Sequence, residues 1–142
     1  METKMIVRRE VNNSNVRVII LIVECDQVAQ TFYRNEIKGP IIISAYSFAQ
    51  ARAILEEAAC GKQRIDFVAF SDARLNGLFL GSQIGLSFLD LVQEFRNRLP
   101  GTSLIGVSNS AEYSERLICA GCGYAVSKGE FPVMMRKILG SS

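Results

Sequence analysis

Apolar segments of strand length alternate along this chain with segments whose apolar residues recur at helical spacing. The apolar segments predict strands at residues 16–23, 41–44, 66–71, 103–107 and 124–126. The segments that follow them predict helices at 27–38, 47–60, 86–99, 111–120 and 130–139. This alternation predicts an α/β fold, a doubly wound five-stranded parallel sheet flanked by helices on both faces.

Individual residues support several of these elements. In the first predicted helix Val28, Phe32 and Ile37 recur at roughly helical spacing, and Gly39-Pro40 ends the helix. Ser47 stands where an N-cap residue is expected for the second helix. Pro132 falls in the first turn of the last helix, where proline is tolerated. The first strand is a nearly continuous apolar run, typical of a strand covered on both faces.

The composition is that of an ordinary globular protein. The 142 residues suffice for one domain, and 49% of them are hydrophobic while 21% are charged. A net charge of +2 gives no reason to expect nucleic acid or a membrane as a partner. Residues 1–15 lack an uninterrupted apolar stretch, so no signal peptide is expected. We expect a flexible or loosely docked arm at 1–15, a domain at 16–142 and a cytoplasmic location.

The cysteines do not form a recognisable metal or disulfide framework. The chain has four cysteines and no histidine, and only Cys119 and Cys122 have C-x-x-C spacing. A zinc site would need two further ligands, and a redox motif would stand at the start of a helix rather than after one. We therefore interpret this pair as the end of a helix followed by a glycine turn.

Polar residues gather at the carboxyl ends of the predicted strands, where doubly wound folds place their sites. They are Glu24, Cys25 and Asp26 after the first strand, Ser44 after the second, Ser71 and Asp72 after the third, Ser108 after the fourth, and Ser127 and Lys128 after the fifth. Oxygen-rich clusters without histidine suit magnesium. A carboxylate nucleophile, a hard cation, a hydroxyl and a lysine are the components of phosphoryl transfer. The alternative for each acid alone is that it caps the helix or turn after its strand.

Four of these segments, in order, resemble the receiver domain of two-component response regulators, the CheY-like fold. "IILIVECDQVAQTFY" resembles the first strand and its acidic turn, and "FVAFSDARLNG" resembles the phosphoacceptor strand and loop. "SLIGVSNS" resembles the strand with the switch hydroxyl, and "AGCGYAVSKGEF" the segment that ends in the family's lysine. The resemblance spans about Val16 to Leu139.

The resemblance implies a role for each matching residue. Asp72 would accept the phosphoryl group, Ser108 would bind a phosphoryl oxygen, and Lys128 would pair with the phosphoryl group. Glu24 would be the first acid of the metal turn, and the backbone carbonyl of Arg74 would complete the shell of a Mg²⁺ ion that also binds Asp72. The implied partners are a sensor histidine kinase or phosphotransfer protein, a downstream protein target or output domain, and a second copy in a homodimer.

The acidic turn departs from the family pattern. Receivers usually have two adjacent acids there, and the second is a direct metal ligand, whereas this chain has Glu24 followed by Cys25. Asp26 comes next, but consecutive side chains point in different directions, so it is a doubtful replacement. We expect Mg²⁺ to bind weakly.

Other departures follow in the later motifs. Asn76 and Gly129 replace two usual prolines, and Asn109 replaces the usual small residue beside the switch hydroxyl, where it would narrow access to Asp72. The aromatic switch position falls on Ala125 or Tyr124. Residues 78–82, "LFLGS", resemble an insertion in the loop after the phosphoacceptor strand.

Three functions remain open on the sequence. The first is a working receiver, a signalling phosphoacceptor with no enzymatic activity beyond its own phosphorylation and dephosphorylation. The second is a pseudo-receiver, an interaction module that does not depend on phosphorylation. The third is a small doubly wound enzyme, which the lack of a glycine-rich phosphate loop after the first strand disfavours. We favour the first, because the nucleophile, the hydroxyl and the lysine are all present.

Overall fold

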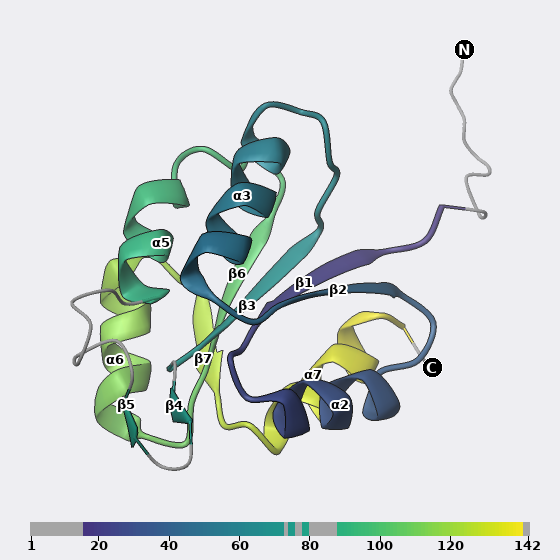
Figure 1. Cartoon of the computed structure of the whole chain (residues 1–142). Coiled ribbons are helices and arrows are strands. Elements are labelled where there is room, and N and C mark those ends of the chain that lie inside the picture. Colours follow the sequence, from purple (N-terminus) through teal and green to yellow (C-terminus); the bar gives the residue numbers. More distant parts are fainter. Residues whose placement is uncertain (1–15, 73, 76–77, 80–87, 141–142) are drawn as a thin grey trace.

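The five predicted strands form one parallel sheet. The computed structural model describes residues 16–72, 74–75, 78–79 and 88–140. The strands are β1 (Ile19–Val23), β2 (Ile41–Ala45), β3 (Phe67–Ser71), β6 (Ser103–Val107) and β7 (Tyr124–Val126). They pair in the order β2-β1-β3-β6-β7, and every neighbouring pair is parallel (Figure 1). When the five strands of this sheet are counted along the chain, their order is 2-1-3-4-5, a doubly wound arrangement.

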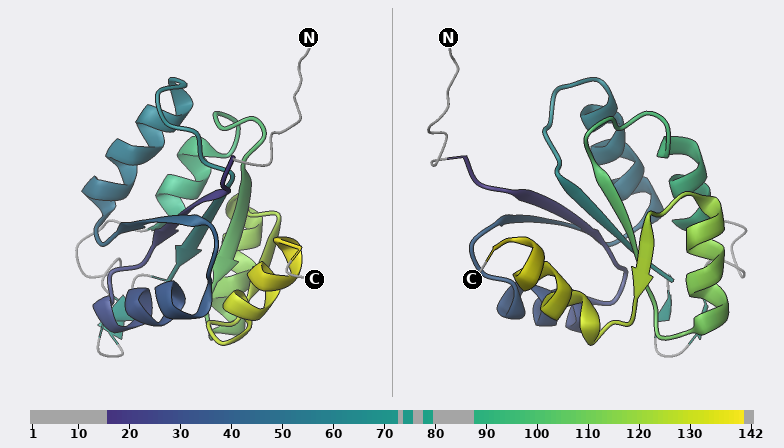
Figure 2. Two further views of the ribbon diagram at one scale, coloured as in Figure 1. Left: turned by 90° about the vertical axis from the view of Figure 1, so that its right-hand side faces the viewer. Right: turned by 180° about the vertical axis from the view of Figure 1, so that it is seen from behind.

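Helices cover both faces of this sheet. They are α2 (Gln27–Glu36), α3 (Phe48–Ala59), α5 (Phe88–Phe95), α6 (Ala111–Ala120) and α7 (Glu130–Ile138). Figures 1 and 2 show α3, α5 and α6 on one face, with α2 and α7 on the other. The predicted three-layer α/β fold is therefore confirmed. Within the described ranges, no helix has the length and apolar character needed to cross a bilayer.

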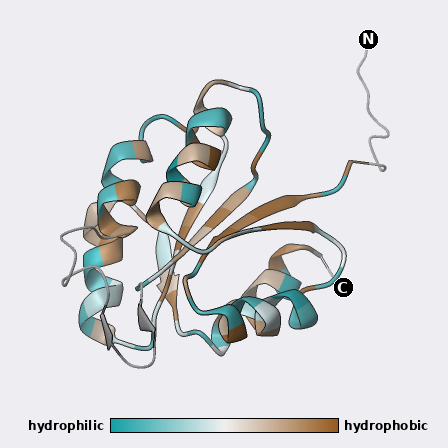
Figure 3. Ribbon diagram, viewed as in Figure 1, coloured by the Kyte–Doolittle hydropathy of each residue, from teal (hydrophilic) through white to brown (hydrophobic). Residues whose placement is uncertain are grey.

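Residues of β1, β2, β3 and β6 serve two separate cores, because alternate side chains of a strand point to opposite faces. Leu21 and Val23 of β1 belong to the core beneath α3, α5 and α6, whereas Ile20 and Ile22 belong to the core beneath α2 and α7. Figure 3 shows the strands mainly in hydrophobic colours and the helices in mixed ones. Burial on both sides explains why the sequence of β1 is nearly continuously apolar.

The element boundaries match the predictions closely, with small differences at some ends. The strands at 103–107 and 124–126 and the helix at 111–120 have the predicted bounds. Ser47 caps α3, since its Oγ accepts a hydrogen bond from the backbone N–H of Gln50 at 3.1 Å. The strand β1 begins at Ile19, and Val16 is largely exposed. The helix predicted at 86–99 is shorter, because α5 ends at Phe95. Residues 1–15 and 86–87 lie outside the described residues.

A short antiparallel pair of strands follows β3 and was not predicted. The strand β4 (Arg74–Leu75) pairs in antiparallel fashion with β5 (Leu78–Phe79). The predicted insertion at 78–82 therefore begins with a strand residue, and its remainder, 80–82, lies outside the described residues.

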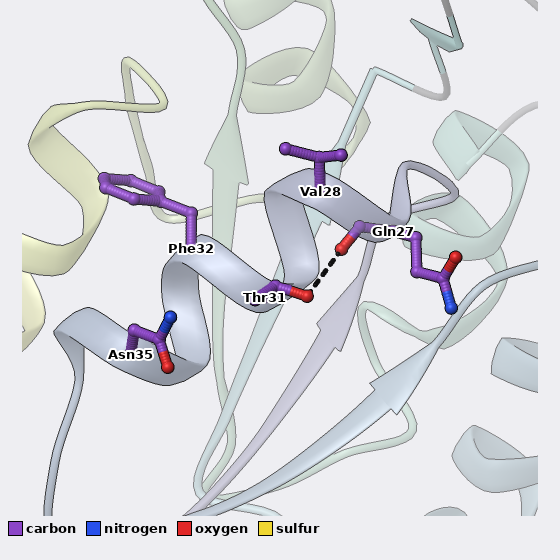
Figure 4. Close-up of a pocket in the computed structure, with 5 residues that line it drawn as sticks. All are labelled: Gln27, Val28, Thr31, Phe32 and Asn35. Carbon is purple, nitrogen blue, oxygen red and sulfur yellow. Dashed lines mark hydrogen bonds between the residues drawn. The ribbon is translucent and has the colours of Figure 1, made fainter.

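Two of the apolar residues at helical spacing in α2, Val28 and Phe32, are not buried. Val28 is 77% exposed and Phe32 is 43% exposed, and both border a shallow hollow of about 480 Å³ (Figure 4). The buried side consists of Gln30, Tyr33 and Ile37, which follow the i, i+3, i+7 spacing of one helix face. Because glutamine is mostly exposed in proteins, the spacing of apolar residues alone does not reveal this buried side.

The C-x-x-C pair is a helix end, as interpreted from the sequence. Gly121 ends α6 with a φ of 144°, a conformation that residues with a Cβ rarely adopt. Cys119 is exposed on the helix and Cys122 is buried after the turn. Burial raises the pKa of the Cys122 thiol to about 12, which suits a core residue and not a reactive one.

We predict that Tyr33→Phe leaves the free energy of unfolding unchanged or raises it by up to ~1 kcal/mol. The ring packs edge-on against Phe131, with centroids 5.2 Å apart, but among the described residues the buried Tyr33 hydroxyl has no hydrogen-bond partner. A buried hydroxyl without a partner costs stability. Urea denaturation would measure the change, with Tyr46→Phe as a control at an exposed tyrosine. A loss above ~1 kcal/mol would mean that the hydroxyl has a partner.

Candidate functional site

The strand order places two carboxylates side by side at one edge of the sheet. Because β1 is flanked by β2 on one side and β3 on the other, the chain changes winding direction between β1 and β3. Ligands of doubly wound sheets bind at this switch point, beyond the carboxyl ends of the strands. Val23 is opposite Phe70 in the register, so the next residues along, Glu24 and Ser71, emerge together with Asp72. Asp72 in turn follows Ser71, which is opposite Val107 of β6.

Lys128 lies between the two carboxylates. Its Nζ is 3.6 Å from Glu24 Oε1 and 3.6 Å from Asp72 Oδ1. Glu24 is fully buried and Asp72 is 2% exposed, whereas the Lys128 side chain keeps 25% of its surface in contact with solvent. Two buried carboxylates repel each other unless a positive charge stands near both, and the Lys128 ammonium is that charge.

Ser108 holds the other oxygen of Asp72. The Ser108 hydroxyl donates a hydrogen bond to Asp72 Oδ2 at 2.8 Å and accepts one from the backbone N–H of Ser110 at 3.0 Å. Because Ser108 Oγ accepts the Ser110 N–H, its own hydrogen is directed at Asp72 Oδ2. Asp72, Ser108 and Lys128, predicted from three separate segments of sequence, therefore meet in one cluster.

Glu24 completes this cluster, and its pKa lies above the ordinary value of a glutamate. Burial raises the pKa of Glu24, and the nearby charge of Asp72 raises it further. A hydrogen bond from the backbone N–H of Asp26 to Glu24 Oε2, at 3.0 Å, the charge of Lys128 and a hydrogen bond from Ser71 all lower it, but burial is the larger cause. The Ser71 contact was not among the roles implied by the resemblance.

Gln30 is a residue of the site that sequence reasoning missed. Its Nε2 is within hydrogen-bond distance of three backbone carbonyl oxygens, those of Ile22 at 2.9 Å, Glu24 at 3.0 Å and Ala45 at 3.2 Å. It therefore ties α2 to the ends of β1 and β2, next to the Glu24 backbone. The available signal was its spacing from Tyr33 and Ile37, which places it on the buried face.

Asp26 and Cys25 lie beside the cluster and have other surroundings. Asp26 caps α2, since its Oδ1 accepts a hydrogen bond from the backbone N–H of Val28 at 2.9 Å. This is the capping role named above as the alternative for each acid. Cys25 is half-buried, and burial and the charge of Glu24 raise the pKa of its thiol to about 11. Arg74 is the first residue of β4, two positions beyond Asp72.

The side chains near Lys128 offer oxygen ligands, which suit a hard cation, but too few of them to surround one. The carboxylates of Glu24 and Asp72 both approach Lys128 Nζ and are oxygen ligands of the type that Mg²⁺ prefers. Across the described ranges, however, no three side chains of histidine, cysteine, aspartate or glutamate form a group that holds a metal ion. The neutral thiol of Cys25 is a poor substitute for a carboxylate.

Two departures from the receiver pattern meet near Lys128. The Oδ1 of Asn109 accepts a hydrogen bond from the backbone N–H of Lys128 at 2.9 Å. Gly129, which follows, has helical dihedral angles, with φ −73° and ψ −31°. Of the two positions considered for the aromatic switch, Tyr124 is 40% exposed and Ala125 is half-buried. Asn76 lies outside the described residues.

Comparison with known proteins gives a result for structure but none for sequence. No protein-family model and no curated protein matches the sequence. The structure is similar to a CheY-like response regulator receiver domain protein from Methanospirillum hungatei JF-1, with a TM-score of 0.66 and 17% identity over 89% of this chain and 93% of that one. It is also similar to a response regulator from Thermotoga maritima, with a TM-score of 0.64 and 16% identity over 89% and 100% of the two chains.

A third similar structure is a response regulator protein from Burkholderia pseudomallei with a phosphorylated aspartic acid, a calcium ion and citrate. The TM-score is 0.61 and the identity 17%, over 87% of this chain and 65% of that one. Structural similarity at such low sequence identity establishes the fold and not the activity. With the strand order and the helix layers described above, they show that this chain has the fold of the receiver domains of response regulators.

Proposed function

We propose that this protein is a signalling receiver that accepts a phosphoryl group on Asp72. The observation that carries the proposal is the position of the Asp72 carboxylate, which is hydrogen-bonded by Ser108 at 2.8 Å and lies 3.6 Å from the Lys128 ammonium. A hydroxyl and an ammonium aimed at one carboxylate are the groups that stabilise the charge of a transferring phosphoryl group. Beyond its own phosphorylation and dephosphorylation, we propose no enzymatic activity.

In the proposed reaction an oxygen of Asp72 attacks the phosphorus of a phosphohistidine or of a small acyl phosphate. A bond forms between this oxygen and phosphorus, the bond from phosphorus to the donor nitrogen or oxygen breaks, and the electron pair leaves with the donor. Lys128 then pairs with the phosphoryl oxygens that have joined Asp72. Ser108 donates its hydrogen bond to one of those oxygens in place of Asp72 Oδ2.

Mg²⁺ is the proposed cofactor, and we propose that it binds weakly. When bound it would offset the negative charge of the carboxylates and of the phosphoryl group. Glu24 and Asp72 would hold it through side-chain oxygens, and Arg74 through its backbone carbonyl. Asp26 is a poor candidate, because its carboxylate is engaged at the start of α2.

The proposed partners follow from the phosphoryl chemistry and the surface near Ser108 and Lys128. A sensor histidine kinase or a phosphotransfer protein would supply the phosphoryl group. A downstream protein, an output domain or a second copy would dock on the surface of α6, β7 and α7, which exposes Ile118, Tyr124 and Val133. Movement of Ser108 and Lys128 toward a phosphoryl group would change this surface and so its affinity for the partner.

A pseudo-receiver is the second candidate, and the residue at position 25 favours it. Cys25 stands where the second acid of a receiver is expected. In this case the surface of α6, β7 and α7 would bind its partner without phosphorylation.

Mass spectrometry after incubation with acetyl phosphate in magnesium buffer tests the proposal. We expect the protein to gain the mass of one phosphoryl group, and the modified peptide to be the one that contains Asp72. No gain with acetyl phosphate or with a phosphorylated histidine kinase would rule out the receiver and favour the pseudo-receiver.

We predict that Cys25→Asp tightens Mg²⁺ binding by on the order of tenfold. The substitution adds a third carboxylate next to Glu24, at the position where the receiver pattern has a direct ligand. Isothermal titration calorimetry would measure the affinity, and Cys119→Asp, at an exposed cysteine of α6, is the matched control. Equal affinity of wild type and Cys25→Asp would show that Cys25 does not occupy a ligand position.

A further inference from the structure

The hydrogen bond between Asn109 and Lys128 joins two loops that carry the site. Asn109 directly follows Ser108 after β6, and Lys128 follows β7, so the bond links the residue next to the hydroxyl with the lysine itself. The strands β6 and β7 are paired just before these loops, and the backbone N–H of Ser108 donates to the carbonyl of Val126 at 3.0 Å. The Asn109 bond extends this pairing beyond the end of the sheet.

The backbone N–H of Lys128 lies in the turn that leads into α7, and it takes its acceptor from another loop. Ser127 and Glu130 form a capping box: the Ser127 hydroxyl accepts from the Glu130 N–H at 3.2 Å, and Glu130 Oε1 accepts from the Ser127 N–H at 3.3 Å. The Phe131 N–H donates to the Ser127 carbonyl at 3.0 Å, as in the first turn of a helix. N–H groups of the first turn have no acceptor within the helix. Asn109 supplies the acceptor for Lys128.

The position of this backbone sets the point from which the Lys128 side chain reaches the two carboxylates. Lysine has a long side chain with four rotatable bonds, and Gly129 after it does not restrict the backbone. The ammonium nevertheless lies at the same distance, 3.6 Å, from Glu24 and from Asp72. A shift of the Lys128 backbone would move the ammonium away from one carboxylate or from both.

We propose that Asn109 is a positioning residue that places the Lys128 ammonium between Glu24 and Asp72 by holding the Lys128 backbone to the loop of Ser108. Its effect on phosphoryl transfer rests on the proposed function, whereas its effect on Lys128 does not. The sequence suggested instead that Asn109 narrows access to Asp72, and the two roles have opposite effects on the rate of phosphorylation. If Asn109 positions Lys128, its removal slows phosphorylation, and if it restricts access, its removal speeds phosphorylation.

The test compares Asn109→Ala, which lacks the acceptor, with Asn109→Asp, which keeps an oxygen at the same place. Asn35→Ala, the same change at an exposed position of α2, is the control. Two properties are measured by NMR: the exchange rate of the Lys128 amide hydrogen and the order parameter of the Lys128 ammonium group. The rate of phosphorylation by acetyl phosphate is measured alongside, and thermal unfolding reports whether each variant is folded.

We expect Asn109→Ala to expose the Lys128 amide to exchange, to lower the order parameter of its ammonium and to slow phosphorylation by about tenfold or more. We expect Asn109→Asp to retain all three properties. An ammonium equally ordered in Asn109→Ala and wild type would overturn the proposal, and so would faster phosphorylation of Asn109→Ala. If wild type takes up no phosphoryl group, the proposed function fails, and the ammonium order alone then decides the role of Asn109.

Discussion

Asp72→Asn is expected to abolish phosphoryl uptake while leaving the fold intact. The amide has nearly the shape of the carboxylate, so it keeps an oxygen that accepts the hydrogen bond of Ser108. It has no nucleophilic oxygen anion, and no bond to phosphorus forms. The measurement is intact-protein mass spectrometry with acetyl phosphate in magnesium buffer, for wild type and variant at equal concentration. Circular dichroism confirms that the variant is folded.

Partner binding by the same two proteins separates a switch from a phosphorylation-independent module. For a switch, we expect the phosphodonor to change the affinity of wild type for its downstream partner, or its self-association. The same donor should leave the binding of Asp72→Asn unchanged. Asp26→Asn is the matched control, since Asp26 caps α2 in the turn after β1. Identical binding of wild type and Asp72→Asn, with and without donor, would contradict the switch.

Lys128→Met is expected to lower the free energy of unfolding by about 3 kcal/mol at pH 7. The ammonium is the positive charge placed between Glu24 and Asp72, at 3.6 Å from each. Methionine fills a similar volume but leaves two buried carboxylates in mutual repulsion. Removing one partner of a buried ion pair costs more than the pair itself contributes, because the remaining charge stays buried.

The loss in Lys128→Met is expected to be smaller at pH 4 than at pH 7. Burial raises the pKa of Glu24 in the folded state, so protonation of Glu24 favours folding. This contribution is fully present below the unfolded-state pKa, near 4.5, and is lost as pH rises through the higher folded-state value. The charge of Lys128 lowers the folded-state pKa of Glu24, so Lys128→Met raises this pKa further. The variant therefore loses more stability than wild type between pH 4 and pH 7.

Urea denaturation at both pH values measures these differences. Lys137→Met, at an exposed lysine of α7, is the matched control and should change stability by less than ~0.5 kcal/mol. We expect Glu24→Gln, added to Lys128→Met, to restore part of the stability at pH 7, because it removes one of the two charges. A loss in Lys128→Met that is equal at both pH values would contradict the electrostatic explanation.

The residues of the site were predictable because the fold brings the ends of parallel strands together. Asp72, Ser108 and Lys128 each follow an apolar strand in the sequence, and in a parallel sheet those ends share one edge. Asp26 illustrates the limit of this reasoning, because a carboxylate after a strand also caps the helix that follows. Only the direction of its side chain distinguishes the two roles, and consecutive residues of similar type leave that direction open.

The sequence by itself determined the α/β class, most element boundaries and the segments that supply the site, because these depend on local periodicity and on where apolar runs end. The tertiary structure alone decided which side of α2 is buried, since the carbonyls of Ile22, Glu24 and Ala45 give buried Gln30 its partners. It also decided the strand order, the ammonium position between two carboxylates and the bond from Asn109 to Lys128. These features join residues far apart in the chain, and their energies depend on distances and burial that no local pattern contains.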